Sequence, residues 1–203
     1  RSIWVTGVQT CALPISPAVS NSAGEAAIRA MTAARQRGAK VSFDCNFRAR
    51  VWGARAQEAP AVLRRLCEQA DVIFGDERDF GFMLGGKAEA AFEAFQHLQF
   101  IACTHRARQS ADVQQLSGSL RSRRDTYTTR PYSLYGIVDR IGAGDAFAAG
   151  VLHGLISSFD PQKAIDFATA AAVLKHSIPG DFNLAGVAEI EAVLSEQQTD
   201  VRR

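Results

Sequence analysis

VDRIGAGDAFAAG, residues 138–150, places a glycine-rich turn directly before an alanine-rich helix. Gly142, Ala143 and Gly144 can bring backbone N–H groups close to an anion, and the first helical turn adds its own N–H donors and positive dipole end. The pattern therefore predicts a phosphate site. Asp145 stands inside it although a carboxylate repels phosphate, which makes sense if it accepts a proton from a hydroxyl attacking that phosphate. The alternative is an ordinary helix start with an acidic first turn.

The same string is very similar to the C-terminal signature of the ribokinase-like (PfkB) carbohydrate kinases, D-[TR]-x-G-[AG]-G-D-x-F-x-x-G. The resemblance implies an α/β ribokinase-like fold, in which a mostly parallel sheet carries helices on both faces. It also implies ATP and Mg²⁺ as cofactors. Asp145 would be the catalytic base and contact the substrate, while Gly142, Ala143 and Gly144 would form an anion hole around the ATP phosphates.

Composition is that of a soluble globular protein. The 203 residues are 47% hydrophobic and 22% charged, and 23 basic and 21 acidic residues leave a net charge of +2. These charges are interspersed, which argues against a nucleic-acid partner. The densest basic cluster, at Arg121, Arg123 and Arg124, is expected to be a solvated hairpin. No apolar run approaches the roughly 20 residues of a membrane span, so no membrane partner is expected.

The cysteines show neither a CxxC motif nor the Cys/His spacing of a metal site. Free buried thiols in a reducing cytoplasm are therefore expected, and the predicted localisation is cytoplasmic. The four residues are Cys11, Cys45, Cys67 and Cys103.

The N-terminal segment VTGVQTCALPI, residues 5–15, looks like the translation of a sequencing-library adapter. Residues 1–15 are therefore predicted to be non-native, and residues 16–203 to be the C-terminal, ATP-binding part of a PfkB-type kinase domain. By the resemblance, the N-terminal strands and a β lid are missing, and this chain alone is expected to be inactive. The alternative is that SIWVTGV is a genuine β-strand, because β-branched and aromatic residues fit one.

Helical and strand patterns alternate along the body of the chain, which predicts a parallel sheet covered on both faces. Gly38 and the Gly85-Gly86 pair end two of the predicted helices. A hairpin is expected from 113–120 and 126–131 around residues 121–125. Predicted helices start at 16–21 and run to 37, then cover 57–69, 76–84, 87–95, 145–157, 161–176 and 187–196; predicted strands cover 40–44, 71–74 and 99–103.

FDCNFRARVW, residues 43–52, follows a predicted strand. Asp44, Asn46 and Arg48 alternate and should point to one side of an extended segment, where they can bind hydroxyls, a carboxylate or a phosphate. The alternative is a polar loop beside a packed Trp52. The segment resembles FDxNxRxxLW of the 2-keto-3-deoxygluconate kinases. That resemblance implies that Asn46 and Arg48 contact ATP, and that Arg48 also meets the anionic end of the substrate or the transferring phosphoryl group.

Gly75 to Asp79 falls where the family carries N-x-x-E, and the chain has Asp76 and Asp79 at those two positions. The resemblance implies that these carboxylates position Mg²⁺ through its water shell, since acidic oxygens suit a hard cation. An N-cap role explains Asp76 equally well.

LKHSIPGDFN, residues 174–183, also resembles the 2-keto-3-deoxygluconate kinases, in which an acidic residue contacts the sugar acid. Asp181 is the candidate, with polar capping of a turn as the alternative. Lys175 and His176 are expected at a helix C-terminus.

The family's K-x-G-x-x-G turn is replaced by Thr104-His105-Arg106. Thr104 and Arg106 are candidates for contacts with ATP by analogy with that turn. His105 is expected at the surface.

The predicted activity is ATP-dependent phosphorylation of a sugar acid, converting 2-dehydro-3-deoxy-D-gluconate to its 6-phosphate. Alternatives are another PfkB kinase of the fructokinase or ribokinase type, or a non-catalytic nucleotide-binding fragment. A preferred substrate with a free carboxylate favours the first, because Arg48 needs an anion. The expected partners are the sugar acid and ATP, with a homo-oligomeric parent protein.

Overall fold

The chain forms two compact units in a computed structural model that describes residues 3–6, 15–108 and 114–200. The first unit comprises Arg1–Ala102 together with Arg121–Asp125, and the second comprises Cys103–Leu120 and Thr126–Arg203. Each unit is described by itself below.

A parallel arrangement of strands organises the first unit. β1 (Ile3–Thr6), β2 (Ala39–Asp44), β3 (Val72–Phe74) and the start of β4 (Phe100–Arg108) lie side by side in this order. All three residues of β3 are buried, as expected for a central parallel strand that is covered on both faces. Ile3–Thr6, which the sequence predicted to be either non-native or a genuine strand, pairs with β2 as a strand.

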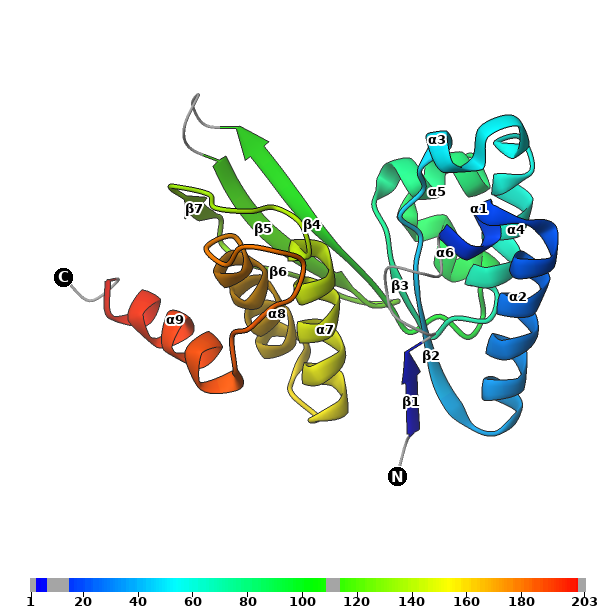
Figure 1. The fold of residues 1–203 in the computed structure, drawn as a ribbon. Coiled ribbons are helices and arrows are strands. Elements are labelled where there is room, and N and C mark those ends of the chain that lie inside the picture. Colours follow the sequence, from blue (N-terminus) through cyan, green and yellow to red (C-terminus); the bar gives the residue numbers. More distant parts are fainter. Residues whose placement is uncertain (1–2, 7–14, 109–113, 201–203) are drawn as a thin grey trace. The chain divides into compact units, whose positions relative to one another are not determined.

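The helices of the first unit pack together beside β2 and β3 (Figure 1). The Ser20 side chain accepts a hydrogen bond from the Ala23 N–H and caps the longest of them. The buried core includes Phe43, Leu66 and Phe80. The helices are α1 (Ile15–Val19), α2 (Asn21–Gln36), α3 (Ala49–Trp52), the 3₁₀-helix η1 (Gly53–Arg55), α4 (Ala59–Cys67), α5 (Glu77–Leu84) and α6 (Ala88–Ala94).

Within its described residues, the second unit combines strands with three helices. Its elements are the rest of β4, β5 (Gln114–Arg121, except its last residue), β6 (Thr126–Thr128), β7 (Tyr132–Leu134), α7 (Ala143–Ile156), α8 (Pro161–Lys175) and α9 (Val187–Asp200). β5 and β7 are antiparallel.

α7 and α8 pack unusually closely (Figure 1). A Cβ added to Gly150 would lie 2.5 Å from the Cα of Ala168, and one added to Gly154 would lie 2.7 Å from the Cβ of Ala164. Each helix thus contributes two small residues four positions apart, on one face. The alanine-rich composition of these segments serves this contact.

The predicted alternation of helices and strands is confirmed, with ends shifted by a few residues. Sequence patterns missed α3, η1 and β7, all of which are four residues long or shorter. β4 is also longer than predicted, because residues 104–108 continue the strand.

The expectation of a solvated hairpin at residues 121–125 is confirmed for Arg123 and Arg124, which are exposed, whereas Arg121 is half-buried. Two of these arginines also have partners within the protein. Arg121 pairs with Glu89 at 2.6 Å and with Glu77 at 3.4 Å. Arg123 donates to the carbonyl oxygens of Phe92, Phe95 and Gln96, over 2.6, 3.0 and 2.8 Å. These partners come from residues far away in the sequence, which a local charge pattern does not reveal.

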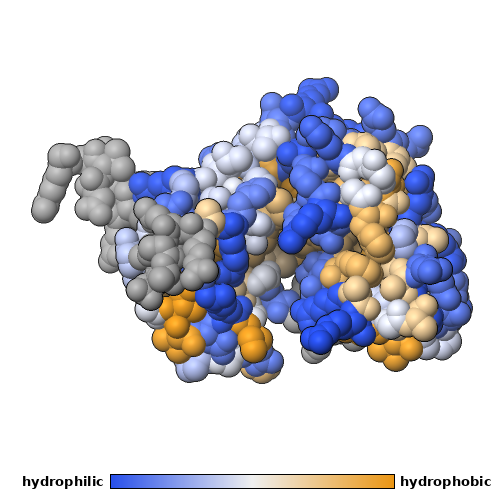
Figure 2. Space-filling view, turned by 90° about the horizontal axis from the view of Figure 1, so that it is seen from above, coloured by the Kyte–Doolittle hydropathy of each residue, from blue (hydrophilic) through white to orange (hydrophobic). Residues whose placement is uncertain are grey.

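Hydrophilic side chains dominate the face seen in Figure 2, and apolar side chains form smaller patches between them. Within the described ranges, the helices are too short or too polar to cross a membrane. Cys45 and Cys67 are buried free thiols whose sulfur atoms lie 4.0 Å apart, and Cys103 is a half-buried free thiol. Cys11 falls outside the described residues.

Candidate active site

The glycine-rich turn of the second unit has the geometry that its sequence predicts. Gly142 is the N-cap of α7 with φ +78°, a left-handed conformation that a residue with a Cβ adopts only at a cost. The Ala146 N–H donates to the Gly142 carbonyl over 2.8 Å and begins the helical ladder. N–H groups of a first helical turn have no acceptor within the helix, which is where an anion can bind. Of those in this turn, the Ala143 N–H donates to the Arg140 carbonyl over 3.4 Å. Asp145 lies in this first turn and is half-buried.

The turn packs against the segment that contains Asp181. A Cβ added to Gly142 would lie 2.0 Å from the Asp181 carbonyl oxygen. The structure therefore brings together two residues that the sequence singled out separately. The Asp181 side chain is exposed and open to a ligand.

Asp139 connects the same two segments and was not identified as a site residue from the sequence. Its carboxylate accepts hydrogen bonds from the N–H groups of Ile141 and Gly180, both at 2.9 Å. These two bonds lower the pKa of Asp139. An ionised Asp139 therefore fixes the approach to the turn. The signal was present, because Asp139 is the first residue of the quoted family signature.

His176 holds the same approach from the C-terminal end of α8, where it was predicted. Its Nδ1 lies 2.6 Å from the Ala172 carbonyl oxygen and its Nε2 lies 2.8 Å from an Arg106 guanidinium nitrogen. A carbonyl only accepts and a guanidinium only donates, so this imidazole is neutral with its proton on Nδ1. Burial, and then the charge of Arg106, lower the pKa of His176. Its backbone oxygen accepts from Val138 and Asp139, at 2.9 and 3.3 Å.

Lys175 and the β4 residues complete this side of the site. Lys175 is fully buried, and its Nζ donates to the Ile178 carbonyl over 2.9 Å. Thr104 lies half-buried in β4, and His105 is exposed, as predicted, with its Nε2 2.9 Å from the Ser119 hydroxyl. Burial, followed by repulsion from another arginine, lowers the pKa of Arg106. The proposed contacts of Thr104 and Arg106 with ATP remain predictions.

The sequence predicted an extended segment after β2 with Asp44, Asn46 and Arg48 on one side, but the positive φ of Asn46 interrupts the extended backbone. Cys45 is fully buried, whereas Asn46 is half-buried and Arg48 is exposed. Asn46 has φ +30°, a conformation that asparagine tolerates better than most residues. Its Oδ1 accepts from Arg48 Nε over 3.2 Å. Among the described residues, the two terminal nitrogens of Arg48 have no acceptor, so this fork is available to a carboxylate or phosphate.

Asp76 and Asp79 form a capping box at the start of α5, which confirms the alternative interpretation of Asp76. The Asp76 carboxylate accepts from the N–H groups of Arg78 and Asp79, at 2.8 and 3.2 Å, while Asp79 accepts from the Asp76 N–H at 2.8 Å. The Arg78 guanidinium also binds Asp76. Burial raises the pKa of Asp79; burial also acts to raise that of Asp76, but hydrogen bonds from Arg78 outweigh it and lower the pKa.

The capping box bears on the metal prediction. A direct bond from Asp76 to Mg²⁺ would compete with Arg78, so the residues fit only a role through water. In the part of the chain that the structure describes, three or more His, Cys, Asp or Glu side chains nowhere converge on a metal position. The involvement of Asp76 and Asp79 with Mg²⁺ remains a prediction.

The candidate residues divide between the two units. The first unit holds Asn46, Arg48, Asp76 and Asp79, and the second holds Thr104, Arg106, residues 142–145 and Asp181.

Known proteins with similar sequences include sugar-acid kinases by name. A 5-dehydro-2-deoxygluconokinase from Listeria monocytogenes is 29% identical over 181 residues, which are 86% of this chain and 53% of the relative. A 2-dehydro-3-deoxygalactonokinase from Haloferax volcanii is 28% identical over 184 residues, 89% of this chain and 55% of the relative. The chain thus spans about half the length of the curated relatives it matches.

The similar solved structures and the matching family model are also carbohydrate kinases. The 2-dehydro-3-deoxygluconokinase of Thermotoga maritima superposes with a TM-score of 0.82 at 32% identity, over 90% of this chain and 59% of that one. A PfkB family carbohydrate kinase of Listeria grayi gives a TM-score of 0.85 at 30% identity, over 96% of this chain and 60% of that one. The model of the pfkB family carbohydrate kinases matches residues 9–183. The ribokinase-like α/β fold is therefore confirmed, and the chain belongs to the PfkB family of carbohydrate kinases.

Proposed function

We propose that this chain is the ATP-binding part of a kinase that phosphorylates a sugar acid, converting 2-dehydro-3-deoxy-D-gluconate to its 6-phosphate. The observation that carries the proposal is the left-handed Gly142 cap, which opens α7 with Asp145 in its first turn. The names of the similar proteins support it, because three of the four kinases named above carry the name of a dehydro-deoxy aldonate.

The turn supplies the chemistry of phosphoryl transfer. Asp145 accepts the proton of the attacking primary hydroxyl, as a general base within reach of that hydroxyl would. Backbone N–H groups of Gly142 to Gly144 stabilise the charge that develops on the transferred phosphoryl group. Asp139 and His176 keep this turn in place through the hydrogen bonds described above.

Substrate recognition is assigned to two further side chains. Arg48 has an available guanidinium fork that suits the carboxylate of a sugar acid. Asp181 lies against Gly142 and is exposed, so its carboxylate can accept a hydrogen bond from a sugar hydroxyl. Asn46, Thr104 and Arg106 are assigned to ATP by the family resemblance.

Mg²⁺ would be bound mainly by ATP phosphate oxygens and water, where it would neutralise phosphate charge. Asp76 and Asp79 would meet that water shell, since their capping bonds leave lone pairs on the carboxylates. We place the protein in the cytoplasm, where ATP is available and thiols stay reduced.

The decisive experiment is an ADP-release assay on the complete protein that contains this chain. We expect turnover with 2-dehydro-3-deoxygluconate to exceed that with fructose or ribose. Asp145→Asn should lower kcat by about 10²–10⁴-fold while ATP binding persists, because an amide cannot accept the proton. Asp166→Asn, on the neighbouring helix α8, is the matched control and should retain activity.

A fructokinase or ribokinase type is indicated if a neutral sugar is preferred. Near-normal turnover by the Asp145 variant would remove the base assignment. The 203-residue chain alone is expected to bind ATP without turnover, the behaviour of a nucleotide-binding fragment.

A further inference from the structure

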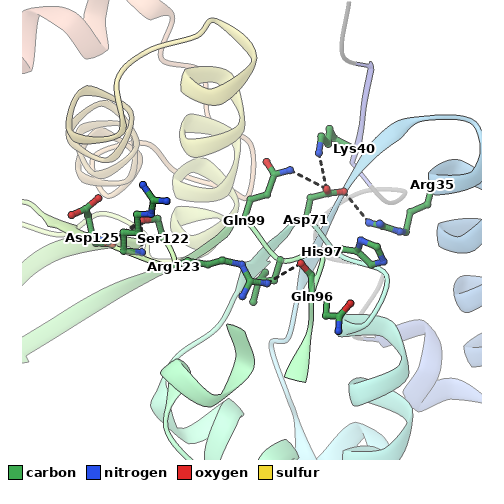
Figure 3. Close-up of a pocket in the computed structure, with 11 residues that line it drawn as sticks. Arg35, Lys40, Asp71, Gln96, His97, Gln99, Ser122, Arg123 and Asp125 are labelled. Carbon is green, nitrogen blue, oxygen red and sulfur yellow. Dashed lines mark hydrogen bonds and ion pairs between the residues drawn. The ribbon is translucent and has the colours of Figure 1, made fainter. Parts of the chain in front are cut away.

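A cavity lies in the first unit, at the amino-terminal ends of its parallel strands (Figure 3). Lys40 is the second residue of β2, Asp71 directly precedes β3 and Gln99 directly precedes β4. The candidate residues Asn46 and Asp76 follow the carboxyl ends of β2 and β3, so the cavity is at the opposite end of these strands. Its volume is about 510 Å³.

The cavity wall is built around a buried carboxylate. Asp71, whose side chain is 5% exposed, accepts from Lys40 Nζ at 2.9 Å, Arg35 at 3.2 Å, the Val41 N–H at 3.0 Å and Gln99 at 3.4 Å. Figure 3 shows the three side chains converging on it. Asp71 is therefore covered, and its carboxylate oxygens are occupied by these donors. The Lys40 ammonium has three N–H donors and the Arg35 guanidinium has five. Asp71 thus holds both cations in position, and each keeps further N–H groups that can bind a ligand.

The lining as a whole is positive. Apart from His97, it contains four cationic side chains and two carboxylates, a net charge of +2. Arg123 is held by carbonyl oxygens, which orient its charge without cancelling it. Arg124 is exposed. Gln96, Gln99 and Ser122 add neutral hydrogen-bonding groups to the same wall.

We propose that this cavity binds a small phosphorylated metabolite, independently of the proposed active site. A cavity of this size accepts a small organic ligand. Both kinds of cation in the wall bind phosphate: lysine acts as a point charge, and arginine donates from a planar guanidinium fork. The amide and hydroxyl side chains suit the hydroxyl groups of the attached carbon skeleton. The proposal does not depend on which sugar the kinase phosphorylates.

The test is a titration of the 203-residue chain with pyrophosphate in Mg²⁺-free buffer, followed by the imidazole NMR signals of its four histidines. His97 lines the cavity and should shift saturably. Gln96→Glu should weaken binding about three- to tenfold, because it adds a negative charge to the wall at almost no change in shape. Gln57→Glu, the same change on an exposed residue outside the cavity, should have no effect.

Arg124→Gln is a second variant that leaves the Asp71 ion pairs untouched, and it should weaken binding by a similar factor. Raising the salt concentration should weaken binding further. An unmoved His97 signal, or equal responses of Gln96→Glu and Gln57→Glu, would overturn the proposal. Gluconate, which lacks phosphate, should not shift His97; a shift equal to that of pyrophosphate would overturn the assignment to phosphate.

Discussion

Replacing Gly142 with alanine perturbs the candidate site at its most constrained position. The substitution places a Cβ on a residue with φ +78°, which costs about 1–2 kcal/mol. The new atom would also lie 2.0 Å from the Asp181 carbonyl oxygen, whereas ordinary contacts begin at 3.4 Å, so the backbone must move by more than 1 Å. Overpacking of this kind costs about 1–3 kcal/mol. We expect Gly142→Ala to lower the free energy of unfolding of the second unit by about 2–5 kcal/mol.

Gly144→Ala is the matched control, two residues further along. Gly144 lies in α7, and a Cβ there meets no atom within 4 Å. Alanine is favoured over glycine in helices by up to about 1 kcal/mol, so stability should stay equal or rise slightly. The assay is urea unfolding followed by far-UV circular dichroism. Tryptophan fluorescence serves as a contrast, because Trp4 and Trp52 both belong to the first unit.

The two variants separate structure from ligand binding. Gly142→Ala should unfold at lower urea even without ATP, whereas Gly144→Ala should be as stable as the parent chain and should differ from it only in phosphate binding. Equal unfolding midpoints for the parent and Gly142→Ala would refute the reasoning, and so would equal destabilisation by both substitutions.

Three further predictions concern other parts of the molecule. Gly150→Ala should destabilise the second unit by about 1–3 kcal/mol in urea unfolding, because its Cβ would lie 2.5 Å from the Cα of Ala168; an unchanged midpoint would contradict the close packing. Arg48→Ala in the complete protein should raise KM for the sugar acid by roughly 10- to 150-fold, because one charge-assisted hydrogen bond is lost, and should raise KM for ATP much less. Equal effects on both KM values in the kinetic assay would indicate that Arg48 binds the ATP phosphates instead. The pKa of His176 in the folded chain lies below its usual 6.5, so the unfolded chain binds a proton more readily as the pH falls. The contribution of neutral His176 to the free energy of unfolding is therefore complete above pH 6.5 and is lost as the pH falls through the folded pKa. Urea midpoints from pH 8 to pH 5 should therefore fall more steeply for the parent than for His176→Gln, in which the contact with Arg106 no longer titrates; parallel curves would exclude this role.

Local features were predictable from the sequence because consecutive residues determine them. The Gly142 turn, the start of α7 and the capping alternative at Asp76 all follow from a few neighbouring side chains and from backbone rules that hold in any protein. Short strands were predicted at residues 40–44 and 71–74, and the structure confirms both as β2 and β3.

Features that depend on distant residues were not predictable. Arg106 and His176 are 70 positions apart and meet only after folding. The buried position of Lys175 likewise has no local signal, since lysine at a helix C-terminus is normally solvated. For the same reason the sequence did not reveal the partners of Arg121 and Arg123, which lie on α5 and α6 and on the residues that follow α6.

The close contact of α7 and α8 also has a consequence for the order of folding. Only residues 157–160 connect the two helices, so the entropy lost in bringing them together is small. Their contacts, such as Gly150 with Ala168, join residues that are near in sequence, and such contacts form faster than pairings between distant strands. The first turn of α7, which contains Asp145, therefore belongs to the helical hairpin that can assemble earliest in the second unit. The contact between Arg106 and His176, which are distant in sequence, forms later.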